Sequence, residues 1–176
     1  TMRPSRSGSG KSTLLEAIAG WLPLREGRIV IAPHDARIGY APQRPYLFHG
    51  SIADNLRIAR PDADDASLQA AAEAAQVMRF ATRLPGGLDT VIGERGFGLS
   101  GGEARRIALA RLFLRDPALA LLDEPTAFLD PDTERAVLEA LVAFARGRTL
   151  IVATHSDAAL EAAGRVVKLH AAGGLQ

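Results

Sequence analysis

The chain has 176 residues, which is the length of one domain, and 47% of them are hydrophobic, enough to bury a core. The formal net charge of +1 offers no basic surface for nucleic acid, and the lack of cysteine excludes disulfides and thiolate metal sites. No apolar run approaches the ~18–20 residues of a membrane span, and no secretory signal is visible. We therefore expect a soluble, cytosol-facing domain, which can still dock on a membrane partner.

A stretch near the start has the end of the pattern G-x-x-x-x-G-K-[ST], in which a loop wraps its backbone N–H groups around phosphates. The lysine of that pattern binds the outer phosphates and the next hydroxyl serves Mg²⁺. The apolar spacing predicts a helix over residues 11–19, whose N-terminus would attract phosphates. This helix argues against the alternative, a flexible terminus. The candidate loop residues are Ser7, Gly8, Ser9, Gly10, Lys11, Ser12 and Thr13.

The residues before this loop are Thr1-Met2-Arg3-Pro4, which are polar and contain proline, so a strand is not expected there. Because a phosphate-binding loop normally follows a buried strand, we expect that the chain begins inside a domain and that its N-terminal strands are missing. A short native N-terminus is the alternative.

The middle of the chain is predicted to be mainly helical. Residues 28–32 and 37–41 have the pattern of short strands, and Gln43 follows in a proline-containing loop. Ser51 is a predicted helix cap, and a longer Ala-rich helix is predicted over residues 64–80. After a glycine-rich loop at 91–98, another helix is predicted to run to about Arg115. We expect a helical subdomain over about 51–115 within one domain of residues 1–176.

The last part of the chain alternates strands and helices. A continuous apolar run at 118–122 predicts a strand buried on both faces, and a second buried strand is predicted at 149–153. A helix is predicted between them at 131–145, and a short helix at 157–163 precedes a strand at 166–169. This alternation predicts an α/β domain with a largely parallel sheet.

Polar side chains follow the two buried strands. Asp123 stands where it could hold a Mg²⁺ ion, which prefers oxygen ligands, and Glu124 could polarise an attacking water. An acidic region before the next helix would explain one carboxylate, but not its pairing with Lys11 and Ser12. His155 could contact the outer phosphate, although a lone histidine at a strand end is more often structural. Gln43 is ordinary alone; within the set it could bind Mg²⁺ or sense the outer phosphate.

A second anion site is predicted at Ser100, Gly101 and Gly102, because a hydroxyl, small glycines and a helix N-terminus suit a phosphate. The simpler interpretation is helix capping, with Glu103 completing a capping box, and both can hold together. Two phosphate sites in one domain are unusual unless one of them serves a second copy.

Taken in order, these motifs resemble the ATP-binding cassette (ABC) nucleotide-binding domains, a P-loop NTPase fold. The resemblance covers nearly the whole chain and is most specific in Leu99-Ser100-Gly101-Gly102-Glu103, followed by Asp123-Glu124 and then His155. It implies that two cassettes, identical or different, clamp two ATP molecules head to tail. The loop at Lys11 would then face Ser100 and Gly102 of the other copy.

The resemblance also implies a role for each matching residue. Lys11 would bind the outer phosphates of ATP, Glu124 would be the catalytic carboxylate, and His155 would be the switch histidine. Asp130 would lie in the loop that crosses to the partner. The residues implied for Mg²⁺ are Ser12, Gln43 and Asp123.

Residues 91–96 and 46–52 are similar to loops of exporters, in which the cassette follows a transmembrane domain on one polypeptide. The likeness is closest to the thiol-reductant (cysteine/glutathione) exporters of cytochrome bd assembly. It implies an ATPase at the cytoplasmic face of a bacterial inner membrane, coupled to a transmembrane domain and not to nucleic acid. Two alternatives are a nucleotide-binding regulatory module without turnover and a soluble cassette ATPase acting on DNA or ribosomes.

The chain departs from the family pattern at several positions. Ser5 replaces the first loop glycine, Arg6 stands where the family often has proline, and Glu103 replaces a commoner glutamine. The upstream aromatic residue that stacks on adenine has no counterpart. The segment between Lys11 and Gln43 is shorter than usual.

Overall fold

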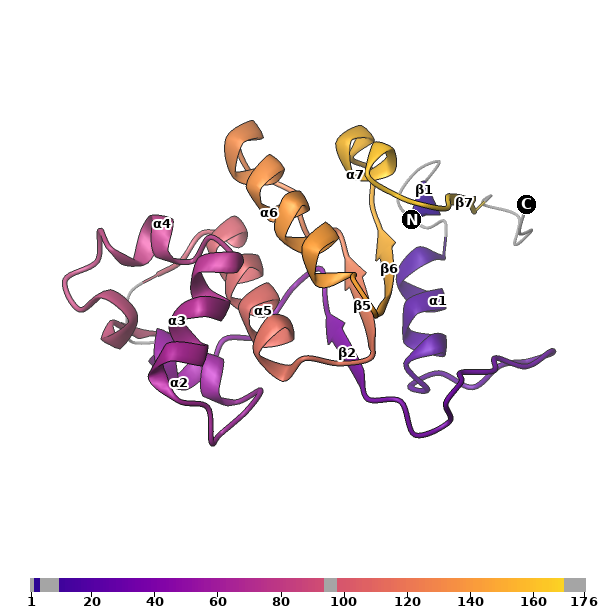
Figure 1. Ribbon diagram of the computed structural model, residues 1–176, viewed down its shortest axis with the longest axis horizontal. Coiled ribbons are helices and arrows are strands. Elements are labelled where there is room, and N and C mark those ends of the chain that lie inside the picture. Colours follow the sequence, from indigo (N-terminus) through magenta and orange to yellow (C-terminus); the bar gives the residue numbers. More distant parts are fainter. Residues whose placement is uncertain (1, 4–9, 94–97, 170–176) are drawn as a thin grey trace.

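The computed structural model describes residues 2–3, 10–93 and 98–169. Its main sheet has the order β2-β5-β6-β1-β7, and each of these pairings is parallel. The sheet therefore confirms the predicted α/β class with parallel strands (Figure 1). The strands are β2 (Ile38–Ala41), β5 (Leu119–Asp123), β6 (Thr149–Ala153), β1 (Met2–Arg3) and β7 (Val167–Lys168).

Strand β5 forms the centre of the core because all five of its residues are buried. Successive side chains of a strand point to opposite faces. Accordingly Leu119 and Leu121 join one hydrophobic cluster with Leu15, while Ala120 and Leu122 join the other. The continuous apolar run of this segment is therefore explained by burial on both faces.

Helices cover both faces of the sheet (Figure 1). Helix α1 (Lys11–Ile18) packs against β5 and β6, and α5 (Gly101–Arg115) packs against β2. Helix α6 (Pro131–Phe144) joins the larger cluster through Val137 and Leu141, and the short α7 (Asp157–Glu161) contacts α6. These helices agree with the predicted ones within about two residues at their ends.

A group of short helices packs against α5, on the side of the molecule away from α1 (Figure 1). Beside it, β3 (Gly50–Ser51) and β4 (Val91–Ile92) form a small antiparallel ladder that the sequence did not predict. The limits of the helical subdomain at about 51 and 115 stay a prediction. The helices are α2 (Ile52–Arg57), α3 (Asp65–Ala74), α4 (Met78–Ala81) and the 3₁₀ turn η1 (Gly87–Asp89).

Three expectations about elements were wrong. Residues 2–3 do form a strand, because Met2 pairs with Ala153 of β6 on one side and with Val167 of β7 on the other. The proline that argued against this strand follows the paired residues instead of occupying them. Residues 28–32 are not a strand: they pair with no strand in the described part of the chain, and residues 21–30 are exposed.

The third correction concerns the predicted helix over residues 64–80, which is two helices, α3 and α4. Gln76 interrupts it with a left-handed φ of 58°, and the N–H of Val77 then bonds to the carbonyl of Ala72. A left-handed residue cannot continue a right-handed helix, so the chain turns before α4 starts at Met78.

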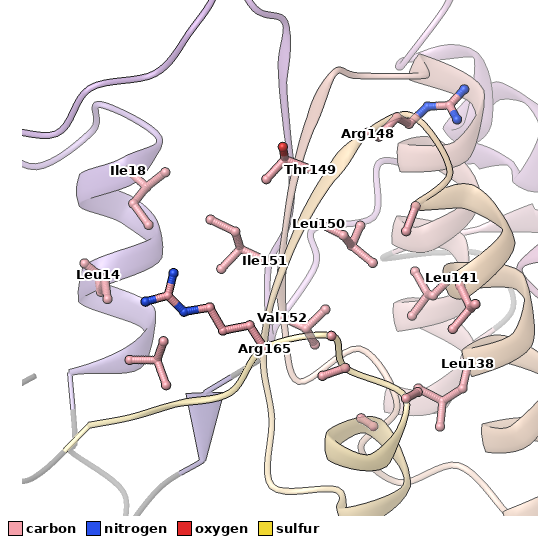
Figure 2. Close-up of a pocket in the computed structure, with 17 residues that line it drawn as sticks. Leu14, Ile18, Leu138, Leu141, Arg148, Thr149, Leu150, Ile151, Val152 and Arg165 are labelled. Carbon is pink, nitrogen blue, oxygen red and sulfur yellow. The ribbon is translucent and has the colours of Figure 1, made fainter. Parts of the chain in front are cut away.

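A groove of about 820 Å³ runs along β6, between α1 and α6 (Figure 2). Leu14 and Ile18 line one side and Leu138 and Leu141 the other, with Ile151 of β6 along its floor. Strand β1 pairs with β6 at Ala153, and the residues of β6 before it, 149–152, line this groove. Within the described residues, no predicted phosphate-site residue lines it. No helix in that same part of the chain is long and apolar enough to cross a membrane.

Candidate functional site

The candidate site forms where the sheet and helix α1 meet. The carboxyl ends of the parallel strands β5 and β6 and the N-terminus of α1 lie at one edge of the sheet (Figure 1). Residues that directly follow or begin these elements are therefore brought together, although those of α1 are more than 100 positions from those of the two strands.

The first contact at this edge joins Ser12 and Asp123. The Ser12 hydroxyl donates a hydrogen bond to Oδ2 of Asp123 over 2.5 Å, and Asp123 is only 4% exposed. A hydroxyl and a carboxylate together are the oxygen ligands that Mg²⁺ accepts. The structure thus places these two predicted metal residues side by side; their role as ligands stays a prediction.

The second contact is a chain of three charged or titratable groups. Nζ of Lys11 lies 3.3 Å from Nε2 of His155. This ring nitrogen of His155 in turn lies 3.1 Å from Oε1 of Glu124. The backbone N–H of His155 also donates to Oε2 of Glu124 over 3.3 Å. Lys11 and Glu124 are buried, whereas the side chain of His155 is 53% exposed. The His155 ring therefore lies on the solvent-exposed side of this cluster.

Glu124 has an unusual environment for a carboxylate. Its backbone has a left-handed φ of 51°, and its N–H donates to the carbonyl of Ala153 over 2.8 Å. Among the described residues, its buried Oε1 accepts no hydrogen bond of good geometry. Burial raises the pKa of Glu124, while His155 and Lys11 act in the opposite direction. A buried carboxylate oxygen that lies beside the His155 ring without a well-aligned hydrogen bond suits a site that receives a water or hydroxyl group.

The loop before α1 is described only at its end. Gly10 is the N-cap of α1 with a left-handed φ of 81°, a conformation that glycine adopts without strain. Thr13 is exposed on the first turn of the helix. The predicted loop residues Ser7, Gly8 and Ser9, and the departure at Ser5, lie outside the described residues.

Gln43 is exposed in the loop after β2. Its side chain forms no hydrogen bond with Ser12 or Asp123 in the part of the chain that the structure describes. Its backbone carbonyl instead accepts a hydrogen bond from Nε of Arg105 over 3.0 Å. The structure therefore places the Gln43 loop beside α5, and the predicted Mg²⁺ contact of Gln43 stays a prediction.

Ser100 and Gly102 begin α5, which packs on a different part of the sheet from α1. Ser100 and Glu103 form the capping box that the sequence predicted, with hydrogen bonds of 3.3 Å and 2.7 Å. A Cβ at Gly102 would lie 3.3 Å from Leu129, so the loop after β5 packs against the start of this helix. Gly101 is exposed next to it. The two predicted phosphate sites are thus separate features of one chain.

Asp130 caps the next helix, α6. Its carboxylate accepts hydrogen bonds from the backbone N–H and the hydroxyl of Thr133, over 3.0 Å and 2.6 Å. These hydrogen bonds lower the pKa of Asp130. The hydroxyl of Thr133 also accepts from Arg79 over 2.6 Å, which ties α4 to this cap. Asp130 is therefore held at the surface in its charged form.

Arg105 is a buried residue of this region that sequence reasoning missed. It contacts the Gln43 loop and the loop after Glu124, as developed below. The available signal was the presence of Arg105, Arg106 and Arg111 in an otherwise apolar helical stretch. Arginines in such positions need backbone carbonyls as partners when the helix is buried.

The donor set fits Mg²⁺ bound together with phosphates. No group of three or more His, Asp or Glu side chains that could hold a metal occurs among residues 2–3, 10–93 and 98–169. Mg²⁺ commonly uses one or two protein ligands together with waters and substrate phosphates. The pair of Ser12 and Asp123 matches that pattern, and the buried cation of Lys11 next to it suits the phosphates.

Comparisons with known proteins agree with this geometry. The family model described as "ABC transporter" matches residues 6–127, and a model described as "AAA domain, putative AbiEii toxin, Type IV TA system" matches residues 94–161. In the solved structure of a bacterial Atm1-family ABC exporter with ATP bound, the matching chain has a TM-score of 0.86 at 36% identity. That match covers 97% of this chain and 31% of the other.

The curated relatives are much longer than this chain. It is 40% identical to "ABC transporter B family member 1" of Arabidopsis thaliana, over 93% of the chain and 14% of the relative. It is 42% identical to "Mycobactin import ATP-binding/permease protein IrtB" of Mycobacterium bovis and 39% identical to "ATP-dependent lipid A-core flippase" of Chromohalobacter salexigens. Each of these two matches covers 92% of the chain and 30% of the relative.

Proposed function

The chain belongs to the ABC transporter family, as an ATP-binding domain of the Atm1/ABCB exporter type, and on this premise we propose that it binds and hydrolyses ATP to drive transport across a membrane. The observation that carries the proposal is the cluster of Lys11, Ser12, Asp123, Glu124 and His155. It brings a buried cation, a pair of oxygen ligands and a buried carboxylate beside an imidazole to one edge of the sheet.

Each group has a part that its position supports. Lys11 binds the outer phosphates of ATP, because its buried ammonium at the start of α1 is a strong donor to phosphate oxygens. Ser12 and Asp123 would hold Mg²⁺, with Gln43 as a further ligand proposed from the resemblance, and the ion would neutralise charge on the phosphates. Gly10 and the residues before it supply backbone N–H groups.

Glu124 orients a water and takes its proton. The water oxygen forms a bond to the terminal phosphorus, the bond from that phosphorus to the bridging oxygen breaks, and the water proton passes to the carboxylate. The raised pKa of Glu124 suits this exchange, since it makes the carboxylate a stronger base. His155 contacts both Lys11 and Glu124 and so holds the ammonium and the carboxylate close to each other.

The site is completed by a second copy. Ser100, Gly101 and Gly102 would bind the ATP held by the partner domain, and Asp130 would lie in the loop between the two. The partner is an identical or a different nucleotide-binding domain. The separation of these residues from Lys11 within one chain supports this arrangement. The solved relative has a chain about three times as long, which supports coupling to a transmembrane domain.

The transported molecule is proposed on likeness alone. Export of cysteine or glutathione at the cytoplasmic face of a bacterial inner membrane follows from the resemblance of residues 46–52 and 91–96. Part of the second segment lies outside the described residues. One relative is named for mycobactin import and another as a lipid flippase, so relatives of similar identity move different cargoes. Transport assays with thiol compounds test this finer proposal separately from ATP hydrolysis.

The hydrolysis proposal is tested with Glu124→Gln, which keeps the shape of the side chain and removes the base. We expect at least a 100-fold loss of phosphate release, with ATP affinity within about threefold of the unmodified protein. Glu139→Gln on the exposed side of α6 is the matched control and should leave both values unchanged. Binding is measured by titration with ATP and turnover by released phosphate.

Two outcomes would contradict the proposal. Steady hydrolysis by Glu124→Gln would remove Glu124 from its role. ATP binding without turnover by the unmodified protein would favour the regulatory module over the ATPase. A preference for DNA or ribosomes as stimulators of turnover would instead point to the soluble cassette class.

A further inference from the structure

We propose that Arg105 is a positioning residue that clamps the Gln43 loop to the loop after Glu124. It thereby sets how much Mg²⁺ increases the affinity of the site for ATP. The inference rests on the proposed function, because it concerns the same ATP site. It assigns a role to a residue outside the motifs that predicted that site.

Arg105 reaches two loops that are far apart in the sequence. Its Nε donates to the carbonyl of Gln43 over 3.0 Å, and its Nη1 donates to the carbonyl of Ala127 over 3.3 Å. The guanidinium also lies 4.9 Å from the centre of the Phe128 ring, and Arg105 is 8% exposed. One planar group therefore fixes the loop that carries a proposed Mg²⁺ ligand to the turn three residues after the proposed base.

The charge of Arg105 is matched to its position. Burial lowers the pKa of Arg105, while the carboxylates of Glu124 and Asp123 raise it and the neighbouring Arg44 lowers it further. A buried guanidinium needs partners for its donors, and here these are backbone carbonyls plus the field of two site carboxylates. Arg105 thus links the two loops and also interacts electrostatically with the carboxylates of Glu124 and Asp123.

The turn that Arg105 holds is under backbone constraint. Phe128 has a left-handed φ of 66° and an 85% exposed side chain, which is uncommon for a bulky residue. Its ring contact with Arg105 and the hydrogen bond to Ala127 favour this conformation. The clamp thus restrains the turn and the Gln43 loop relative to each other.

Arg106 provides a matched control in the same helix. It is 9% exposed, donates to the carbonyls of Gly102 and Gln76, and lies 4.8 Å from the centre of the Phe80 ring. It therefore has the same residue type, burial and kinds of partner as Arg105. Its partners belong to α5 itself, to α4 and to the segment between α3 and α4, not to the loops of Gln43 and Glu124.

The test compares ATP affinity with Mg²⁺ and with EDTA, so that the readout is the gain in affinity that Mg²⁺ provides. We expect Arg105→Gln to reduce this gain by about tenfold or more, as for other residues that orient metal ligands. Arg105→Lys keeps one donor for the Gln43 carbonyl and should give an intermediate gain. Arg106→Gln should keep the full gain, although its thermal stability falls as much as that of Arg105→Gln.

The outcomes separate this inference from the proposed function. An unchanged gain in Arg105→Gln, or an equal loss in Arg106→Gln, would overturn the role of Arg105. If Arg105→Gln does not fold, Arg105→Lys decides, and a full gain in that variant would overturn the role. Failure of the unmodified protein to bind ATP at all would instead contradict the proposed function.

Discussion

At the scale of single residues, Glu124 combines a buried carboxylate with an oxygen that accepts no hydrogen bond among the described residues. Burying a carboxylate lowers the stability of the fold unless its partners fully replace the water that it loses. The carboxylate of Glu124 persists beside Lys11 and His155, which favour its charged form. An arrangement that is unfavourable for stability but suited to a water molecule is typical of a functional site.

This environment gives stability a predictable dependence on pH. The native pKa of Glu124 is raised above its ordinary value of 4.5, so the native state binds this proton more tightly than the unfolded state. Proton binding by Glu124 therefore adds to the free energy of unfolding below about pH 4.5. This stabilisation is lost as pH rises through the raised pKa. We expect the stability advantage of Glu124→Gln over the unmodified protein to grow with pH across that window, as measured by urea unfolding.

Asp130→Asn is the control with the opposite sign. Hydrogen bonds from Thr133 lower the pKa of Asp130 below its ordinary value of 3.8, so its contribution is present above that pH and is lost in more acidic solution. A pH-independent difference between Glu124→Gln and the unmodified protein would show that burial does not raise the pKa of Glu124.

At the scale of elements, the contact between β2 and α5 depends on a residue without a side chain. A Cβ at Gly39 would lie 2.5 Å from Cδ1 of Leu112 and 2.6 Å from Cγ of Pro117. The leucine could turn away, but the proline ring is fixed by its own backbone. Gly39 therefore allows β2 to approach the end of α5, the helix that begins with Ser100.

We expect Gly39→Ala to destabilise the fold by about 1–3 kcal/mol, the usual range for an overpacked core. The measurement is the midpoint of urea or thermal unfolding. Gly164→Ala is the control, because a Cβ there meets nothing within 4 Å, and it should stay within about 0.5 kcal/mol of the unmodified protein. Equal stability of Gly39→Ala would mean that β2 and α5 can separate without loss.

The elements also show what sequence patterns can and cannot predict. The strand β5, the helix cap at Ser51 and the capping box at Ser100 were predicted because each depends on residues close together in the sequence. Strand β1 was missed and a strand at 28–32 was wrongly expected, because strands depend on a partner elsewhere in the chain. Arg105 was missed for the same reason, since its partners lie 62 and 22 positions away.

At the scale of the whole molecule, the parallel sheet brings the motifs together. The order β2-β5-β6-β1 aligns the ends of the strands that carry Gln43, Asp123 and His155. The structure brings Lys11, Ser12, Asp123, Glu124 and His155 together at this edge, whereas their roles toward ATP and Mg²⁺ stay predictions. The positions of Ser7 to Ser9 and the contact of Gln43 with a metal depend on loop conformations and a ligand, which local patterns do not determine.

The whole molecule should become more stable when ATP occupies this site. A ligand that binds only the native state stabilises it by about 2.7 kcal/mol at a concentration 100 times its Kd. For a domain of this length, that corresponds to a rise in Tm of about 5–10 °C. We expect this rise with Mg²⁺ and ATP in the unmodified protein, as measured by thermal unfolding.

Lys11→Ala should abolish most of that rise, because it removes the buried cation next to His155 and Glu124. Losing a buried charged donor to a phosphate costs about 2–5 kcal/mol of binding, which is roughly a 30-fold or larger loss of affinity. Lys168→Ala is the matched control: this lysine is exposed on β7, and its removal should leave the rise unchanged. Tm values are compared at the same ATP concentration, with Tm without ligand subtracted for each variant. A full rise in Lys11→Ala would exclude Lys11 from the phosphate site, whereas a rise lost equally in Lys168→Ala would show that ATP acts through nonspecific charge.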